Sequence, residues 1–263
     1  MDKAKKNQLK MIREVLKERS FRERENIFAA EGSKIVTDAL LRKKDVKSVF
    51  ISGRVLGAPG ARQIIEICDS MRIDVFRVAA EEFEKLSSLN NSQGVLALIS
   101  KPSWDTSLVG KFNVLCDGVQ DPGNIGAIIR TSAAFGVSSV LLFGTTADPY
   151  NPKVVRASSG TLLELPVINV TPEKIEDLRF RGYRIFSAAS GRSGASDIAS
   201  IGTIGENIIL AFGNEGKGLS PYITERSDRL FHIPISPAAE SLNVTAAAAI
   251  ALYCFSSARR ENG

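Results

Sequence analysis

A strand–loop–helix–strand segment near the middle of the chain is the feature that most constrains the fold. The apolar run Phe112–Asp117 predicts a strand buried on both faces, and a Gly/Pro/Asn loop separates it from an expected helix, Ile125–Phe135. Gly136 follows at the position of a left-handed helix cap, and Ser139–Phe143 predicts the next strand. Such short loops on both sides of a helix indicate a βαβ unit and therefore a parallel sheet.

Further apolar runs in this half of the chain predict more strands of the same sheet, with helices between them. They cover Leu163–Val167, Arg184–Ala188, Asn207–Phe212 and Leu230–Ile235. Residues 242–259 are rich in alanine and contain neither glycine nor proline, which predicts a final helix.

The first hundred residues also alternate between helix and strand patterns, but in shorter segments. The expected order is helix 4–19, strand Ile27–Ala30, helix Ile35–Leu41, strand Val46–Ser52, helix 60–70, strand Asp74–Val78, helix Ala80–Leu86 and strand Gly94–Ser100. The polar, proline-bearing stretch Lys101–Ser107 is the best domain boundary. We therefore expect a small N-terminal α/β domain over residues 1–100, a linker over 101–110 and a parallel-sheet α/β domain over 111–263.

Composition argues against several classes of protein. The chain has no run of eighteen apolar residues and a polar N-terminus, so we expect neither a membrane span nor a secretory signal. Three widely separated cysteines match no metal-binding spacing, which indicates buried thiols in a reducing cytoplasm and no metal site. His232 is the only histidine and lies in an apolar run, which argues against a hydrolytic triad.

All of the excess positive charge lies at the N-terminus. Residues 1–24 carry nine basic and four acidic side chains, whereas the other 239 residues carry 25 of each sign. A local basic patch is typical of a phosphate-binding surface. A solubilising N-terminal helix is the alternative interpretation.

The first candidate functional loop is Asp117–Gly126, at the carboxyl end of a predicted strand. Ligands bind at that edge of open α/β sheets. Asn124 is placed to cap the following helix, and Arg130 lies farther along it among apolar residues. The alternative interpretation gives Asn124 only a capping role and Arg130 only the role of a surface or interface cation.

The second loop, Phe212–Ser220, follows another apolar strand. Its three glycines, Gly213, Gly216 and Gly218, allow the backbone to approach a ligand closely. Their spacing fits neither the dinucleotide-binding fingerprint nor the phosphate-binding P-loop pattern.

The third loop, Ile233–Thr245, joins a predicted strand to the final helix. Two prolines stiffen it, and the run Ser241-Leu242-Asn243 precedes the helix. Ser241 or Asn243 acting only as a helix N-cap is the alternative interpretation.

In this order, the three loops closely resemble the three motifs of the SpoU/TrmH family of RNA 2′-O-ribose methyltransferases, in the SPOUT superfamily. The matching runs are Pro-Gly-Asn-Ile-Gly with Arg130, Gly213-Asn-Glu-Gly-Lys-Gly-Leu, and Ile-Pro followed by Ser-Leu-Asn-Val-Thr. The segment from Phe28-Ala-Ala-Glu-Gly to Gln93-Gly-Val is similar to the RNA substrate-binding domain that precedes the catalytic domain in many members. The chain departs from the third motif at Ile235 and Pro237, where methionine and glycine are usual.

The resemblance implies a catalytic domain with a deep trefoil knot, an S-adenosylmethionine cofactor and a homodimer formed through that domain. The residues that it implies for the cofactor are Gly213, Asn214, Gly218, Ile233 and Leu242; those for catalysis are Asn124, Arg130, Glu215, Ser241 and Asn243. Arg130 is expected to act across the dimer. Because arginine keeps its proton in proteins, we expect it to grip a phosphate or stabilise the developing alkoxide rather than act as a general base.

The expected substrate is ribosomal RNA, namely 23S rRNA, and the expected location is the cytoplasm. The N-terminal cations then become candidate phosphate contacts: Lys10, Arg13, Lys17, Arg22 and Arg24. A tRNA methyltransferase and an antibiotic-resistance methyltransferase are alternatives within the enzyme class. A non-catalytic RNA-binding or ribosome-assembly factor is the alternative from another class.

Overall fold

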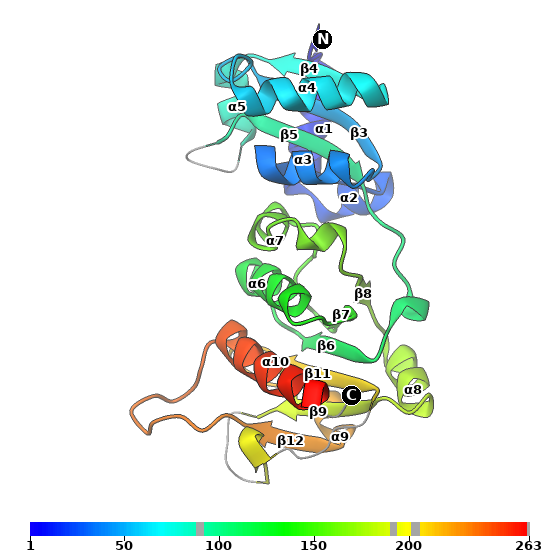
Figure 1. Ribbon diagram of the computed structural model, residues 1–263, viewed down its shortest axis with the longest axis vertical. Helices are drawn as coiled ribbons and strands as arrows, with labels where there is room; N and C mark the ends of the chain where they lie inside the picture. Colours follow the sequence, from blue (N-terminus) through cyan, green and yellow to red (C-terminus); the bar gives the residue numbers. More distant parts are fainter. Residues whose placement is uncertain (88–91, 190–193, 201–205, 262–263) are drawn as a thin grey trace. The chain divides into compact units, whose positions relative to one another are not determined.

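The computed structural model describes residues 1–87, 92–189, 194–200 and 206–261, with side chains up to Ala258. These residues form two compact units (Figure 1). One unit contains Met1–Ser103 together with Tyr150–Leu163, and the other contains Trp104–Pro149 and Glu164–Gly263. The segment Tyr150–Leu163 therefore packs with the N-terminal residues, although it lies far along the chain.

The N-terminal unit is built on a five-stranded mixed sheet in the order β1-β4-β3-β5-β2. Its elements are β1 (Asp2–Lys3), α1 (Lys6–Lys17), α2 (Arg19–Glu25), β2 (Ile27–Glu31), α3 (Ser33–Leu41), β3 (Val46–Ser52), α4 (Pro59–Met71), β4 (Asp74–Val78), α5 (Ala80–Leu86), β5 (Val95–Ser100), α7 (Pro152–Ala157) and the 3-10 turn Thr161–Leu163. Strand β5 pairs antiparallel with both β2 and β3, and the other pairs are parallel. Helix α1 buries Leu9, Ile12 and Val15 against this sheet, as the helical spacing predicts.

Arg22 corrects one expectation about the basic N-terminus. Its side chain is buried, only 2% exposed, and its Nη1 donates a hydrogen bond of 2.7 Å to the carbonyl of Val15. A guanidinium enclosed between α1 and α2 in this way cannot contact an RNA phosphate. Its role is to satisfy backbone groups in the interior, since a buried polar group needs a partner.

We expect Arg22→Ala to lower the free energy of unfolding by about 2–4 kcal/mol, because it removes buried packing and leaves the Val15 carbonyl without this donor. Lys17→Ala, at an exposed position of the same segment, is expected to change it by less than about 0.5 kcal/mol. Urea titration of both variants measures the difference. Equal stabilities would contradict a structural role for Arg22.

The C-terminal unit is built on a seven-stranded sheet in the order β10-β12-β9-β11-β6-β7-β8, and all of its strand pairs are parallel. Its elements are the 3-10 turn Thr106–Leu108, β6 (Phe112–Asp117), α6 (Pro122–Ala134), β7 (Ser139–Phe143), β8 (Val167–Asn169), α8 (Pro172–Phe180), β9 (Arg184–Ala188), β10 (Ser196–Asp197), the 3-10 turn Ile198–Ser200, β11 (Ile208–Gly213), α9 (Pro221–Glu225), β12 (Arg229–His232) and α10 (Val244–Glu261). The expected parallel α/β sheet is confirmed.

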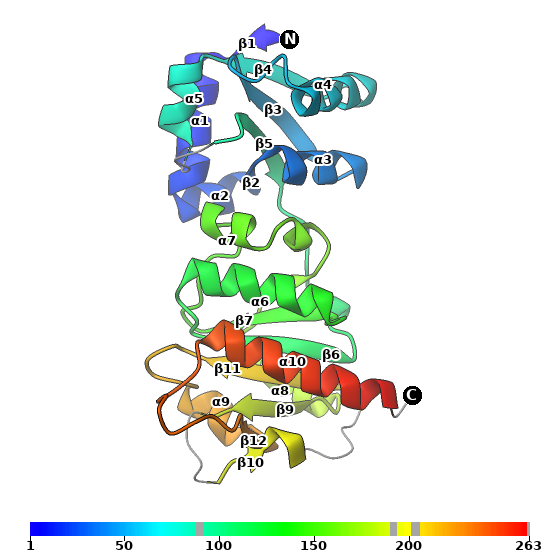
Figure 2. The ribbon, with the colours of Figure 1, turned by 60° about the vertical axis from the view of Figure 1, so that its left-hand side comes forward.

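Helices cover both faces of this sheet. Helices α8 and α9 bury Ile175, Leu178 and Ile223 in one cluster with strand residues Leu115 and Ile209. Helix α10 lies beside α6 and packs against the opposite face, where alternate strand side chains point (Figure 2). The strands are therefore buried from both sides, as their continuous apolar runs predict.

Several expected boundaries were wrong, and proline explains two of them. The strand expected over Leu163–Val167 instead begins at Val167, because Pro166 has no N–H for the strand ladder. The strand expected over Leu230–Ile235 ends at His232, two residues before Pro234. Gly136 has a φ of 71° directly after α6, which confirms the left-handed cap.

The described residues give no sign of a membrane helix or a metal cluster. None of their helices is long and apolar enough to cross a bilayer. Nor do they contain a group of three His, Cys, Asp or Glu side chains able to hold a metal ion. Burial raises the pKa of the Cys68 thiol to about 11 and that of Cys116 to about 12, so both are protonated at neutral pH, as expected for buried thiols.

Candidate active site

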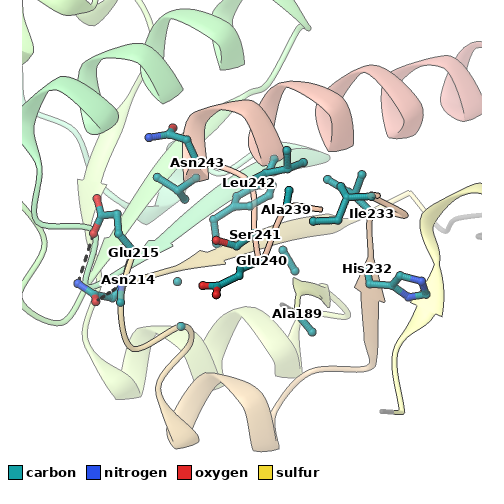
Figure 3. A pocket seen from close by; sticks show the side chains of 18 of the residues that line it. Ala189, Asn214, Glu215, His232, Ile233, Ala239, Glu240, Ser241, Leu242 and Asn243 are labelled. Atoms are coloured by element: carbon teal, nitrogen blue, oxygen red, sulfur yellow. Dashed lines mark hydrogen bonds between the residues drawn. The ribbon is translucent and has the colours of Figure 1, made fainter. Parts of the chain in front are cut away.

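A cavity of about 790 Å³ lies at the carboxyl end of the C-terminal sheet (Figure 3). Three segments line it: Ala188–Ala189 at the end of β9, Phe212–Gly218 at the end of β11, and most of the stretch from Phe231 to Ala247. This volume lies in the range of small-molecule sites. The second and third segments are the two loops singled out from the sequence. The lining includes all five cofactor residues predicted from the resemblance: Gly213, Asn214, Gly218, Ile233 and Leu242.

The glycine loop is closed by a very close approach of its own backbone. A Cβ atom on Gly213 would lie 2.2 Å from the carbonyl carbon of Gly218 and 2.3 Å from the nitrogen of Leu219. Asn214 and Gly218 exchange two backbone hydrogen bonds of 2.9 Å across the loop. Gly213 is therefore required by sterics, independently of any ligand.

Asn214 holds the glycine loop in shape with both ends of its side chain. Its Oδ1 accepts hydrogen bonds from the backbone nitrogens of Gly216 and Lys217, and its Nδ2 donates to the carbonyl of Gly118. The last of these bonds joins the glycine loop to the first loop. Asn214 thus lines the cavity while organising the two loops that border it.

Two further contacts hold the far end of the glycine loop. The buried Asp117 carboxylate, at the end of β6, accepts a hydrogen bond of 2.6 Å from the backbone nitrogen of Ser220. Ser220 then caps α9, and its Oγ accepts from the nitrogen of Ile223. The loop is consequently fixed to the sheet at the point where the helix begins.

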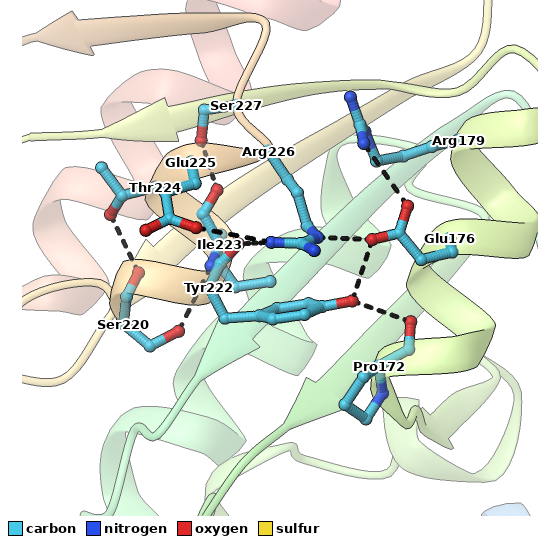
Figure 4. A network of polar contacts seen from close by, with 10 residues as sticks. All are labelled: Pro172, Glu176, Arg179, Ser220, Tyr222, Ile223, Thr224, Glu225, Arg226 and Ser227. Carbon is cyan, nitrogen blue, oxygen red and sulfur yellow. Dashed lines mark hydrogen bonds and ion pairs between the residues drawn. The ribbon is translucent and has the colours of Figure 1, made fainter.

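Helix α9 has only five residues and is held in place by a polar network with α8 (Figure 4). Glu176 accepts hydrogen bonds from Arg226 Nε at 2.5 Å and from the Tyr222 hydroxyl at 3.2 Å. The Arg226 guanidinium lies 3.7 Å from the centre of the Tyr222 ring, which stacks on Phe143. The hydrogen bond from Arg226 lowers the pKa of Glu176, so the carboxylate stays charged in this network at neutral pH.

Three predicted catalytic residues from three different loops meet at one side of the cavity. Asn124 Nδ2 donates a hydrogen bond of 2.8 Å to Glu215 Oε1, and Asn243 Nδ2 lies 3.5 Å from Asn124 Oδ1. Glu215 and Asn243 line the cavity itself. The cluster therefore places amide and carboxylate groups beside the space available to a ligand.

The expectation that Asn124 caps its helix was wrong. Helix α6 begins at Pro122, and Asp121 is its N-cap, accepting a hydrogen bond from the Asn124 nitrogen. The Asn124 side chain is thereby free to reach Glu215. Asn243, in contrast, has a double role, because its Oδ1 accepts from the nitrogen of Thr245 in the first turn of α10.

Arg130 lies apart from this cluster. Its side chain is exposed on α6 and does not line the cavity. Within the described residues it forms no hydrogen bond or ion pair. Ser241, the remaining predicted catalytic residue, does line the cavity and is exposed.

Pro237 occupies a position that suits proline. The nitrogen of Ala239 donates to the carbonyl of Ser236, which makes residues 236–239 a turn with Pro237 in its second position. Proline is favoured there because its φ is already close to the value the turn needs. The departure from the usual glycine is thus accommodated by the turn.

Several cavity residues were not predicted. Ala188 and Ala189 could have been found from the rule that ligands bind where parallel strands end. Lys217 and Glu240 lie within the two predicted loops, but spacing alone does not indicate which way a loop side chain points.

The structure leaves four of the five predicted RNA-contacting cations on the surface. Lys10, Arg13, Lys17 and Arg24 are exposed, whereas Arg22 is buried. Lys10 and Arg24 form ion pairs with Glu14 and Glu25. Such exposed pairs are weak, so they leave both cations available to a phosphate.

A parallel α/β sheet with a cavity at its carboxyl edge defines a class of ligand-binding α/β proteins rather than one activity. Residues 111–253 match the SpoU rRNA methylase family, and residues 6–97 match an MRM3-like substrate-binding domain. The chain belongs to the SpoU rRNA methylase family.

Two similar proteins cover most of the chain, and a third covers just over half of it. The 23S rRNA (guanosine(2553)-2′-O)-methyltransferase of Bacillus subtilis is 30% identical over 88% of this chain and 89% of its own length. The SpoU methyltransferase AviRb from Streptomyces viridochromogenes, solved in complex with the cofactor AdoMet, superposes with a TM-score of 0.87 at 26% identity, covering 97% of this chain and 99% of that one. A TrmH/SpoU tRNA-modifying enzyme from A. aeolicus reaches a TM-score of 0.51 at 28% identity, over 59% of this chain and 81% of that one.

Proposed function

We propose that this protein transfers the methyl group of S-adenosylmethionine to a ribose 2′-hydroxyl in 23S ribosomal RNA. The observation that carries the proposal is the cluster of Asn124, Glu215 and Asn243 beside the cavity. These residues come from three loops far apart in the chain, and each is a polar residue of a different family motif.

The cavity fits the adenosine part of the donor. Gly213 brings the backbone close to the ligand space, and Ile233 and Leu242 supply partly buried apolar surface. Backbone N–H and C=O groups beside apolar walls suit a purine and a ribose better than a polyphosphate. Gly218 and Asn214 shape the same wall from the glycine loop.

Methyl transfer to a hydroxyl requires a nucleophile held in line with the methyl carbon and a path for its proton. Glu215 and Asn243 are placed to orient the ribose, with Asn124 joining them and Ser241 nearby on the cavity wall. Arg130 supplies a permanent positive charge for a neighbouring phosphate or the developing alkoxide.

We propose that Arg130 of one subunit acts at the cavity of a second copy of the chain. It lies on the exposed side of α6, next to α10, where Ile250 and Tyr253 expose apolar surface. Tyr253 also packs edge-on against Phe135, at the end of α6. A homodimer through this helix pair would cover the apolar side chains and bring Arg130 to a partner's cavity. Light scattering of the purified chain tests the oligomeric state.

Two further features are part of the proposal. The return of the chain from β12 at one side of the sheet to α10 beside α6 is consistent with the deep trefoil knot of the SPOUT superfamily. The division into a substrate-binding domain (1–100), a linker (101–110) and a methyltransferase domain (111–263) follows from the sequence, and action on ribosomal RNA implies the cytoplasm.

The exposed N-terminal cations are proposed to contact RNA phosphates. Changing Lys10, Arg13, Lys17 and Arg24 together to glutamine should weaken RNA binding and reduce the slope of log K against log salt by about 2–4, because each lost contact removes roughly 0.7–0.9. The buried Arg22 is left intact so that the fold is not disturbed. Filter binding of 23S rRNA fragments at several salt concentrations measures the slope.

A control variant carries the same charge change elsewhere. It replaces four exposed cations of the C-terminal unit by glutamine: Lys174, Arg179, Arg181 and Arg184. Its salt slope is expected to stay near that of the wild type. An unchanged slope in the N-terminal variant would remove these cations from the RNA-binding surface.

The activity is tested in two steps. Calorimetric titration with S-adenosylmethionine measures donor binding, and tritiated methyl transfer compares ribosomal RNA with tRNA, both taken from cells that lack the gene. We favour ribosomal RNA because the 23S rRNA methyltransferase of Bacillus subtilis matches 88% of the chain, whereas the tRNA-modifying enzyme of A. aeolicus matches 59%. Methyl transfer to tRNA alone would establish the alternative substrate. The absence of donor binding or of methyl transfer would favour a non-catalytic RNA-binding factor.

A further inference from the structure

Two charged side chains of opposite sign line the cavity without a partner. Glu240 comes from the third loop and Lys217 from the glycine loop. Neither forms a hydrogen bond or ion pair through its side chain within the described part of the chain. Their charges are therefore available to a ligand.

The other ionisable groups of the cavity are already engaged. Glu215 accepts hydrogen bonds from Asn124 and Asn214. His232 Nδ1 lies 3.2 Å from the carbonyl of Ala195, and its ring points away from Glu240 (Figure 3). Figure 3 also shows the Glu240 carboxylate directed into the cavity, toward the side where Asn214 lies. Glu240 and Lys217 are thus the pair that can meet a charged ligand group.

An RNA phosphate cannot satisfy both charges. It would be attracted by Lys217 but repelled by Glu240. S-adenosylmethionine, in contrast, ends in an amino acid that carries one ammonium and one carboxylate. A zwitterion of this kind matches an anionic and a cationic side chain on two loops that line the same cavity.

Resting on the proposed function, we propose that Glu240 and Lys217 form the subsite for the amino-acid end of the donor. Glu240 binds its ammonium group, and Lys217 binds its carboxylate. Glu215 and Asn243 are left to the ribose of the RNA. The pair accordingly selects an adenosine donor that carries an amino acid over one that lacks it.

Three ligands of graded structure test this assignment in calorimetry without RNA. S-adenosylmethionine and S-adenosylhomocysteine both carry the amino acid, and only the first has a sulfonium charge. 5′-Methylthioadenosine lacks the amino acid. Glu240→Gln and Lys217→Gln should each lower the affinity for the first two ligands roughly five- to tenfold and change the affinity for the third by less than about twofold. The loss is moderate because both charges are partly screened by water.

A matched control and three outcomes make the test decisive. Glu173→Gln removes an exposed carboxylate on α8, away from the cavity, and should leave all three affinities unchanged. Wild-type affinity of either cavity variant for S-adenosylhomocysteine would overturn the proposal. So would a loss confined to S-adenosylmethionine, which would place the charge at the sulfonium, or an equal loss for 5′-methylthioadenosine, which would indicate a distorted loop.

Failure of this inference is distinguishable from failure of the proposed function. If the wild-type protein binds none of the three ligands, the proposed function fails. If the wild type binds the donor and methylates ribosomal RNA, and both variants bind the donor as tightly as the wild type does, only the subsite is wrong.

Discussion

Arg130→Ala is expected to lower kcat at least a hundredfold, about 2.7 kcal/mol of transition-state stabilisation, while donor binding stays close to wild type. The reason is that Arg130 is exposed on α6 and lies outside the cavity lining, so its removal disturbs neither the cavity nor the core. Its proposed contact is with the RNA or the reacting oxygen. Single-turnover methyl transfer and calorimetry measure the two effects separately.

Arg181→Ala removes another exposed arginine, at the end of α8, and serves as the control with unchanged rate. If Arg130→Ala keeps more than about a tenth of the wild-type kcat, a loss of only ~1.4 kcal/mol, the proposed role of Arg130 is wrong.

Mixed dimers test whether Arg130 acts across the interface. Arg130→Ala and Glu215→Ala subunits are each expected to be inactive as homodimers. When the two are mixed, action in trans gives every mixed dimer one site with both Arg130 and Glu215, and about a quarter of the wild-type rate should return. Action within one subunit restores nothing, because each subunit then has a defective site.

Gly213→Ala is expected to reduce donor affinity at least a hundredfold and to destabilise the fold by about 1–3 kcal/mol. The added Cβ would lie 2.2 Å from the Gly218 carbonyl carbon, and this neighbour is backbone that cannot rotate away. The glycine loop must therefore open, which moves Asn214 and the cavity wall that it supports.

Gly57→Ala is the matched control, because a Cβ there meets no atom within 4 Å. Calorimetry with S-adenosylhomocysteine and thermal unfolding measure the two effects of each substitution. Donor binding by Gly213→Ala within threefold of the wild type would show that the loop tolerates the shift.

The order of elements and the location of the site could be predicted from the sequence. Continuous apolar runs such as Phe112–Asp117 and Ile208–Gly213 indicate strands buried on both faces, and short loops indicate parallel connections. Because such strands carry ligands at their carboxyl ends, the Gly-rich loops that follow them were identified as candidate binding segments.

Boundaries were less predictable where two local rules compete. Asp121 and Asn124 are both good N-cap residues, and only the structure decides that Asp121 caps α6 and that Asn124 reaches Glu215. Asn124 and Glu215 are 91 residues apart in the sequence, and no local pattern predicts a contact over that separation.

The sequence by itself determined the class of fold, the three loops and the excess of cations at the N-terminus, because periodicity, glycine spacing and charge are local properties of the chain. Only the tertiary structure decided which cations are on the surface: Arg22 is enclosed by helix packing, whereas Arg13 and Lys17, in the same segment, are exposed. Only it placed Glu240 and Lys217 on the walls of one cavity. The direction in which a side chain points depends on contacts between distant segments, and those contacts exist only once the sheet has brought the loops together.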